Sequence, residues 1–401
     1  LDANPAKADS MIAGSATGDK FGIQPGEKGG KVAKIDNPSQ DKPDSPTTPK
    51  SESPTAAESD IEKRAHETQA KIAELQENIG YVPIDDLLSV NVETYSDPSE
   101  PDKTFFRVSI QPRGDKPIPI IPKDIVFVQD VSGSMTSEGV VFCRRAMSAA
   151  LKTLNAADRF NVVSFRDSFQ NCFPDWVPAT AANVQKADTF VDGLRSFGTT
   201  DVFGSLRALM TLPRDPRRPM IAFIVTDGKP TAGLTESASI IGDFSALNNG
   251  MISIYMLGTK SNANAYLIDM LTYCNRGGSS INSGDRWDIP AAMAKSCDSI
   301  RNPVMGDITV AFDAASASEV YPRQTANLYK DTPLQFCGVC PNSTDDLIFQ
   351  VRGLASDKGY EALFRLNLKR QAKAGSKDLP GLWAHQKMYY LVGQYSRHPD
   401  Q

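Results

Sequence analysis

Apolar residues in the middle of the chain form short uninterrupted runs, separated by stretches with helical periodicity. The runs are Ile125–Val128, Phe160–Phe165, Met220–Val225 and Ile252–Met256. Runs of this kind suit strands that are covered on both faces of a sheet. Helical stretches that would supply the cover lie near residues 138–154, 181–194, 202–211, 236–248, 264–275 and 288–301. The alternation predicts an α/β domain with a doubly wound, mostly parallel sheet at residues 122–302.

On both sides of this domain the pattern changes to an alternation with a period of two residues, which is typical of half-buried strands. It appears in Leu88–Val92 and Phe106–Ile110 before the domain, and in Ile308–Phe312, Leu347–Val351 and Phe364–Leu368 after it. We therefore predict β segments at 81–121 and 303–375 that pair into one β-sandwich, with the α/β domain inserted in it or flanked by it. Two separate β modules would give the same pattern.

The two ends of the chain have a different character. Residues 1–57 are rich in Pro, Ser, Lys, Asp and Gly, with almost no aromatic side chain, so burial cannot offset the entropy of ordering and we predict a disordered linker or tether. Residues 58–80 carry apolar residues at helical spacing, namely Ile61, Ala65, Ile72 and Leu75. This spacing predicts a short amphipathic helix, either docked or solvated. Residues 376–401 predict a C-terminal helix.

Composition excludes two classes of partner. The 401 residues are 40% hydrophobic and 23% charged, as is usual for a globular protein. The formal net charge is -5 and the basic residues are scattered, which argues against nucleic-acid binding. No apolar run approaches the roughly 18 residues that a membrane-spanning helix needs. We expect neither a nucleic-acid partner nor a transmembrane segment in this chain, and the oligomeric state stays open.

A short polar motif follows the first strand of the α/β domain. The run Ile125–Gln129 continues directly into Asp130-Val-Ser132-Gly-Ser134, which places oxygen-bearing side chains at i, i+2 and i+4. In a locally extended turn, alternate side chains share a face, so these three can converge. A carboxylate with two hydroxyls, without His or Cys, suits a hard cation such as Mg²⁺ or Ca²⁺ and not Zn²⁺ or Cu²⁺.

Two further segments can deliver oxygens to the same edge of the sheet. The strand Ile221–Thr226 ends in Asp227, and Thr200 lies in the segment Gly198–Val202 just before a helix. In open α/β sheets, ligands bind at the carboxyl edge of the strands, where the strand order reverses. We therefore add Thr200 and Asp227 to the candidate metal ligands.

In order and in residue type, these three segments resemble the metal-ion-dependent adhesion site of von Willebrand factor type A domains. The resemblance implies that five side chains hold a divalent cation: Asp130, Ser132, Ser134, Thr200 and Asp227. Ser132 and Ser134 would be direct ligands, Thr200 a direct or water-mediated one, and the two carboxylates would act mostly through bridging waters. The implied ion is Mg²⁺, with Mn²⁺ or Ca²⁺ as alternatives. Its partner would be a protein that offers an Asp or Glu side chain to complete the coordination.

A looser likeness to inter-alpha-trypsin inhibitor heavy chains and their bacterial relatives extends over roughly residues 85–397. It is carried by the flanking β segments, by Val320-Tyr-Pro-Arg323 and by Leu382-Trp-Ala-His385. Relatives of that kind continue beyond the final helix, which leaves open whether the chain ends at Gln401. In von Willebrand factor type A domains, closure on an acidic ligand can be coupled to a shift of the last helix, here 288–301, which is the two-state element that allostery requires.

The sequence contains no arrangement typical of an enzyme. The histidines, His66, His385 and His398, lie far along the chain from the polar loop, and nothing resembles a catalytic triad or a Gly-x-Ser-x-Gly elbow. Gly228-Lys-Pro-Thr231 lacks the upstream glycine of a phosphate-binding loop, because position 223 is Phe. We therefore expect a protein that is not an enzyme.

Six cysteines are an even number, which favours an oxidising compartment without requiring disulfides. Candidate pairs are Cys143 with Cys297, and Cys274 with Cys297 or Cys172. Cys337 and Cys340 lie among strands, as a structural disulfide or as two inert thiols. Together with the trimmed N-terminus and the linker, these cysteines lead us to expect an extracellular, periplasmic or cell-surface location.

Three functions are compatible with these features. The first is an extracellular or surface protein that binds acidic groups of a protein partner through a divalent cation. The second is a structural protein that assembles surface or matrix complexes, in which the metal site is secondary. The third is a role in an intracellular enzyme complex, as von Willebrand factor type A domains have in some chelatases or ATPases.

Overall fold

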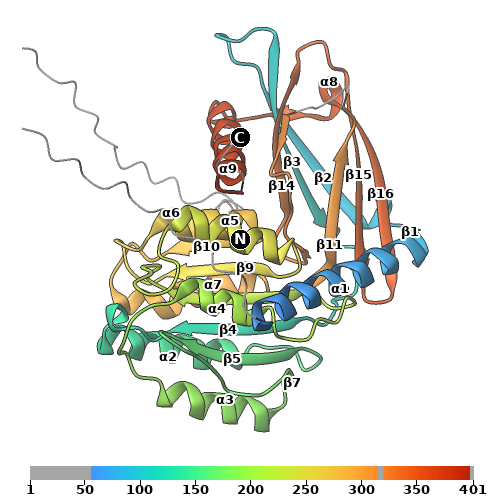
Figure 1. Ribbon diagram of the computed structural model, residues 1–401. Coiled ribbons are helices and arrows are strands. Elements are labelled where there is room, and N and C mark those ends of the chain that lie inside the picture. The colour runs from blue at the N-terminus through green and yellow to red at the C-terminus, as the bar shows by residue number, and fades with distance from the viewer. Residues whose placement is uncertain (1–55, 315–318, 398–401) are drawn as a thin grey trace, which may run out of the picture.

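The computed structural model describes residues 56–314 and 319–397. The predicted linker at 1–57 therefore lies almost wholly outside the described residues, as do the last residues of the predicted C-terminal segment. An α/β domain and a β-sandwich lie side by side, and a long helix runs across both (Figure 1).

The sheet of the α/β domain has the strand order β10-β9-β8-β4-β5-β6, and β7 pairs with β5. Its strands are β4 (Asp124–Asp130), β5 (Arg159–Phe165), β6 (Phe169–Asn171), β7 (Val177–Pro178), β8 (Met220–Thr226), β9 (Ser253–Gly258) and β10 (Gly278–Ile281). Pairing is parallel from β10 to β5 and antiparallel between β5 and both β6 and β7. Every residue of β4 and β8 is buried, as expected for central strands covered on both faces.

Helices cover both faces of this sheet. One face carries α2 (Ser137–Leu151), α3 (Ala181–Gly193) and α7 (Ile289–Ser299), which share a core with the sheet. The other face carries α4 (Val202–Leu209), α5 (Ser237–Asn248) and α6 (Ala265–Cys274). Each helix lies where the periodicity predicts it, and the doubly wound α/β fold is confirmed.

The β-sandwich combines strands from before and after the α/β domain. One sheet has the order β12 (Glu319–Tyr321), β14 (Leu334–Pro341), β3 (Lys103–Pro112), β2 (Leu88–Tyr95) and β17 (Lys373–Ala374). The other has the order β1 (Tyr81–Pro83), β16 (Lys358–Asn367), β15 (Asp346–Ala355), β11 (Pro303–Phe312) and β13 (Leu328–Tyr329). Because all of β14 pairs with β3, the α/β domain is inserted into one sandwich. Phe106, Phe336 and Phe349 lie in the core between the two sheets.

Short helical turns complete the connections. They are the 3-10 turns η1 (Asp85–Leu87), η2 (Gly133–Met135) and η3 (Arg286–Asp288), and α8 (Leu368–Gln371). Leu368, predicted as the end of a strand, instead begins α8, where Asn367 caps the helix by accepting a hydrogen bond from the Arg370 amide.

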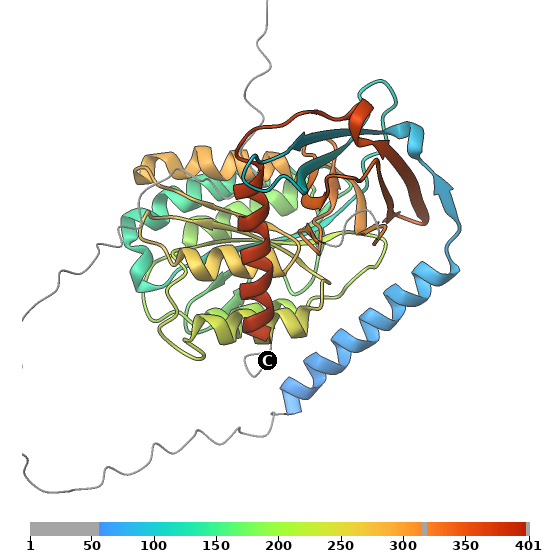
Figure 2. The ribbon, with the colours of Figure 1, turned by 90° about the horizontal axis from the view of Figure 1, so that it is seen from above.

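The helix α1 (Ala56–Asn78) lies along the outside of the α/β domain (Figure 2). Ala65 is buried in the same core cluster as α5, and the Gln69 side chain donates to the Asn249 carbonyl. The residues around Ala65 are mostly exposed. The predicted amphipathic helix is thus docked along a narrow stripe.

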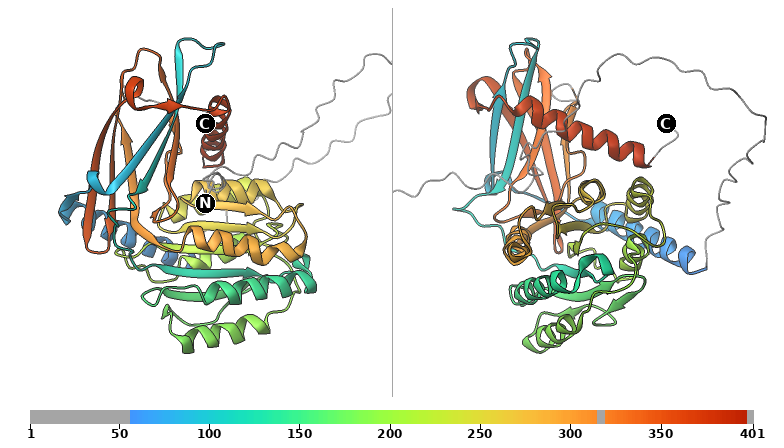
Figure 3. Two further views of the ribbon diagram at one scale, coloured as in Figure 1. Left: turned by 180° about the vertical axis from the view of Figure 1, so that it is seen from behind. Right: turned by 90° about the vertical axis from the view of Figure 1, so that its left-hand side faces the viewer.

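The C-terminal helix α9 (Leu379–Arg397) crosses over α5 and α6 and also contacts the sandwich (Figure 3). Its Trp383 indole donates to the Glu319 carbonyl in β12, and its Tyr389 hydroxyl donates to Asp269 in α6. A side chain on Gly242 in α5 would collide with the backbone of α9, since its Cβ would lie 2.1 Å from the Ser396 carbonyl oxygen. Among the described residues, no helix is long and apolar enough to cross a membrane.

All six cysteines are free thiols. Cys143 and Cys297 lie on the neighbouring helices α2 and α7 but are not bridged, and the other candidate pairs are also absent. Burial raises the pKa of Cys143 and of Cys297 to about 12, so both thiols stay protonated and unreactive near neutral pH.

Candidate metal centre

The register of the sheet brings two of the predicted residues to one point. β4 and β8 are neighbours and run in parallel, with Gln129 opposite Val225. Asp130 and Asp227 therefore emerge from adjacent strand ends. The strand that pairs with β4 on its other side is β5, so the order reverses between β4 and β8. Ligand sites of open α/β sheets lie at such a reversal.

Asp130 shapes the loop that follows β4. One carboxylate oxygen accepts a hydrogen bond from the Ser132 amide at 2.9 Å, and the other accepts one from the Thr226 hydroxyl at 2.6 Å. The side chain is fully buried. Burial raises the pKa of Asp130 to about 6, although the bonds from Ser132 and Thr226 oppose this rise. The carboxylate thus fixes the position from which Ser132 is presented.

The two serine hydroxyls and Asp227 form a chain of close oxygens. Ser132 Oγ and Ser134 Oγ are 3.0 Å apart, and Ser134 Oγ donates to Asp227 Oδ1 at 3.2 Å. Because the Ser134 proton is directed to Asp227, Ser134 Oγ accepts the proton of Ser132, and one lone pair of each hydroxyl oxygen is left to coordinate a cation. Ser132 and Asp227 are buried and Ser134 is half-buried, so the cluster approaches the surface at Ser134.

Thr200 is brought to this edge by its backbone. Its amide donates to the Thr231 hydroxyl at 2.8 Å, and its carbonyl accepts from the Thr231 amide at 2.9 Å. The preceding segment is joined to the metal loop, because the Gly133 amide donates to the Gly198 carbonyl at 3.0 Å. Thr200 itself is 1% exposed. These bonds place the segment and do not involve the Thr200 hydroxyl.

The sequence analysis missed two side chains of this cluster, Thr226 and Lys260. Lys260 follows β9, and its ammonium donates to the Ser134 carbonyl and lies 3.4 Å from Asp227 Oδ2. Thr226 is the last residue of β8. Both stand at or just beyond the carboxyl end of a predicted strand, so their position along the sheet was the signal that could have revealed them.

The residues at this point fit a hard divalent cation. The donors are oxygens only, from hydroxyls and carboxylates, which are the ligands that Mg²⁺ and Ca²⁺ prefer. Mg²⁺ also keeps several waters, so a small protein ligand set suffices. In the part of the chain that the structure describes, no three His, Cys, Asp or Glu side chains gather into a metal-binding group. Hydroxyl oxygens would therefore have to complete any metal site here.

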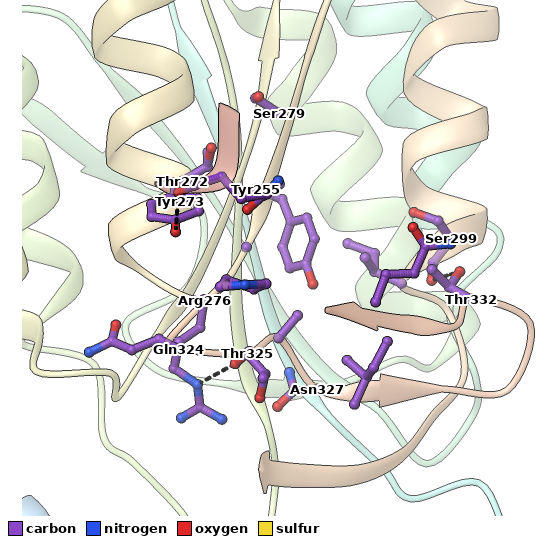
Figure 4. Close-up of a pocket in the computed structure, with 18 of the residues that line it drawn as sticks. Tyr255, Thr272, Tyr273, Arg276, Ser279, Ser299, Gln324, Thr325, Asn327 and Thr332 are labelled. Carbon is purple, nitrogen blue, oxygen red and sulfur yellow. Dashed lines mark hydrogen bonds between the residues drawn. The ribbon is translucent and has the colours of Figure 1, made fainter. Parts of the chain in front are cut away.

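A second group of polar residues lines a cavity between the α/β domain, the sandwich and α9, which we call the junction cavity (Figure 4). Its volume is about 120 Å³. Tyr255 points into the space between Arg276 and Gln324 on one side and Ser299 and Thr332 on the other. The cavity lies by the amino end of β10, away from the metal centre.

Residues 123–280 match the family model described as the von Willebrand factor type A domain. Among curated relatives, the inter-alpha-trypsin inhibitor heavy chain H4 of Homo sapiens is 26% identical over 236 residues, which are 57% of this chain and 25% of that protein. Heavy chain H2 of Sus scrofa is 25% identical over 300 residues, 70% of this chain and 32% of that protein. The chain thus spans about a third or less of the length of these relatives.

Among solved structures, a von Willebrand factor type A protein from Catenulispora acidiphila aligns with a TM-score of 0.56 at 13% identity, over 75% of this chain and 76% of that one. A likeness at this identity concerns the fold. The resemblance to von Willebrand factor type A domains and to inter-alpha-trypsin inhibitor heavy chains, predicted from the sequence motifs, is confirmed by these matches.

Proposed function

We propose that this chain binds an acidic side chain of a partner protein through a divalent cation, Mg²⁺ in the first instance, held at Ser132, Ser134 and Asp227. The observation that carries the proposal is the chain of oxygens, 3.0 and 3.2 Å apart, at the switch point of the sheet. Von Willebrand factor type A domains commonly mediate protein–protein interaction, which supports a binding role and not an enzymatic one.

The charge of the donors supports an acidic ligand. Hydroxyl oxygens carry no formal charge and the Asp227 carboxylate carries one, so Ser132, Ser134 and Asp227 would leave a divalent cation incompletely neutralised. Asp130 is fully buried and already accepts two hydrogen bonds, so it contributes charge at a distance. A carboxylate from a partner would complete the octahedron that Mg²⁺ demands and would form a charge-assisted contact there.

An extracellular or cell-surface location is part of the proposal, and it rests on the resemblance to the inter-alpha-trypsin inhibitor heavy chains. The cysteines lend it no support, because all six are free thiols. An intracellular role in an enzyme complex would agree equally well with reduced thiols.

A capture experiment with matched variants tests the proposal. The wild-type chain, the double variant Ser132→Ala/Ser134→Ala and the control Ser137→Ala are immobilised and exposed to an extract of the source tissue or cells. Ser137 is an exposed residue at the start of α2. We expect a partner that the wild type and the control retain in Mg²⁺, and that both EDTA and the double variant release.

Two results would count against the proposal. Retention of the same partner in EDTA and by the double variant would favour the structural alternative, in which the chain assembles complexes and the metal site is secondary. Failure of the wild type to bind Mg²⁺, Mn²⁺ or Ca²⁺ in a calorimetric titration would remove the metal from the function altogether.

A further inference from the structure

We infer that Lys260 is a built-in competitor of the divalent cation, so that metal enters the centre only when this ammonium leaves Asp227. The inference rests on the proposed function and concerns the regulation of the same site. Lys260 contacts both Ser134 and Asp227, which lie at one end of the chain of oxygens. Its ammonium donates to the Ser134 carbonyl and lies 3.4 Å from Asp227 Oδ2.

The backbone around Lys260 is tied to the strand that carries Asp227. The Thr259 amide donates to the Thr226 carbonyl at 3.0 Å, and the Asn264 amide donates to the Asp227 carbonyl at 3.0 Å. The turn between these two bonds is closed by the Ala263 amide, which donates to the Lys260 carbonyl. The lysine is therefore presented to the carboxylate by a well-bonded loop, and its place is built into the fold.

Burial explains why the carboxylate needs this partner. The Asp227 side chain is 0% exposed, whereas that of Lys260 is 33% exposed. A buried carboxylate without a compensating charge is costly, because it has lost its hydration. Lys260 supplies the compensation when no metal is bound. Its flexible stem and partial exposure also give the ammonium a way out to solvent.

A divalent cation bound at Asp227 and the Lys260 ammonium would repel each other. Both are attracted to the Asp227 carboxylate, and like charges a few ångströms apart disfavour each other. Binding of the metal must therefore displace the ammonium, and this displacement weakens the apparent metal affinity. The structure thus assigns to Lys260 the task of setting the metal concentration at which the centre fills.

Calorimetric titration of Mg²⁺ and Mn²⁺ into wild type, Lys260→Met, Lys260→Gln and the control Lys229→Met tests this assignment. Lys229 lies in the loop after β8, and the salt bridges of the described residues join Asp227 to Lys260 and not to Lys229. We expect both Lys260 variants to bind metal about tenfold more tightly than wild type, the size of effect that removal of one nearby like charge produces. The control should bind within about twofold of wild type, since among the described residues no ion pair joins the half-buried Lys229 to Asp227.

A thermal scan of the same four proteins gives a second measurement. Without metal, the Lys260 variants should melt at a lower temperature than wild type, because Asp227 is left uncompensated, and saturating Mg²⁺ should raise their melting temperature by more than it raises that of wild type. Equal metal affinity in wild type and the Lys260 variants would overturn the inference and leave the proposed function intact. So would tighter binding by wild type. Absence of binding in all four folded proteins would overturn the proposed function, and the inference with it.

Discussion

The candidate metal centre and the junction cavity both gather polar side chains around one sheet, at different places along its strands. In the cavity the buried tyrosine hydroxyls are bonded within the fold, although one guanidinium nitrogen of Arg276, Nη2, has no hydrogen-bond partner there. The hydroxyls of Tyr255 and Tyr329 are 3.1 Å apart, and the Asn327 amide donates to Tyr329 at 3.3 Å. The Arg276 guanidinium donates to the Thr325 carbonyl at 2.9 Å. Burial raises the pKa of both tyrosines, so their hydroxyls stay neutral.

At the metal centre a fully buried carboxylate has only weak or replaceable partners. Asp227 accepts one hydrogen bond from Ser134 at 3.2 Å and faces the ammonium of Lys260, whose side chain is 33% exposed. The two regions therefore differ in how easily the partners of a buried charge can be replaced, and not in how many polar groups they hold. Because the partners of Asp227 can be replaced, the carboxyl edge of the sheet is the better candidate for a binding site than the junction cavity.

The largest expected effect is a loss of stability on substitution of Lys123, which directly precedes β4 at the edge of the sheet opposite the metal centre. Lys123 and Asp158 form a buried ion pair at 2.5 Å, and Lys123 also donates to the Arg301 carbonyl. Burial lowers the pKa of Lys123, although Asp158 opposes this. Removal of one partner leaves the other charge buried, so Lys123→Ala should lower the free energy of unfolding by about 3–5 kcal/mol. Urea unfolding measures this loss.

The exposed pair of Lys116 with Asp86 is the matched control for that variant. Lys116→Ala should cost far less than Lys123→Ala, because solvent screens an exposed ion pair. Both variants, measured where they remain folded, should bind Mg²⁺ as wild type does. A loss of metal affinity in folded Lys123→Ala would contradict the expectation that the two ends of the strands act independently.

Asp130→Asn should weaken metal binding. The amide keeps the size of the carboxylate but removes one acceptor and the negative charge, so Ser132 or Thr226 loses its partner. Groups that orient metal ligands contribute about 10–100-fold to affinity, and we expect a loss in that range by calorimetry. Asp201→Asn is the control, because Asp201 caps α4 by accepting from the Gly204 amide and asparagine caps helices equally well. Similar losses in both variants would contradict a specific role of Asp130.

Tyr329→Phe probes the junction cavity. It removes the hydroxyl shared by Tyr255 and Asn327, and we expect a loss of about 1 kcal/mol in the free energy of unfolding, as for a single buried hydrogen bond. Metal affinity should stay as in wild type. If this variant instead loses metal binding or partner capture while it remains folded, the junction cavity belongs to the functional site together with the metal centre.

The smallest effect concerns α7. Family resemblance leads us to expect that the last helix of the domain shifts when an acidic ligand binds, and α7 packs directly against α2, which follows the metal loop. Hydrogen exchange in 289–299 should change by a modest factor when Mg²⁺ and the captured partner are both present. Neither alone should produce the full change. Identical exchange in all conditions would remove the coupling from the account.

Most of the fold and the core of the site could be predicted from the sequence, because both depend on local patterns. The run Ile125–Val128 indicated a central strand. The polar loop directly after it must therefore lie at the carboxyl edge of the sheet. The pairing of the two β segments into one sandwich was predicted, although two β modules share the same alternation. The strand β14, which pairs with β3, was not among the predicted strands. β10 was also missed. Its sequence, Gly278–Ile281, has no apolar run, because this strand lies at the end of the sheet.

The position of Lys260 and Thr226 at strand ends could have marked them as candidates, but the sequence alone could not assign their roles. Their roles depend on which strand ends are neighbours, and that is fixed by strand order and register. A lysine after a strand is usually a solvated charge, and only the buried Asp227 beside it gives Lys260 a specific role. The cysteines are the reverse case. Their even number invited pairing, but the helices place Cys143 and Cys297 as separate buried thiols.

A crystal structure of the wild-type chain soaked with Mn²⁺, with anomalous diffraction measured for the metal, tests the central claim most directly. We predict one anomalous peak at the carboxyl edge of the sheet, about 2.2 Å from Ser132 Oγ and Ser134 Oγ, the distance typical of oxygen ligands to such ions. The Lys260 ammonium should then have moved away from Asp227. No peak at this cluster in crystals that remain ordered at saturating Mn²⁺, or a peak held only by other residues, would contradict the account.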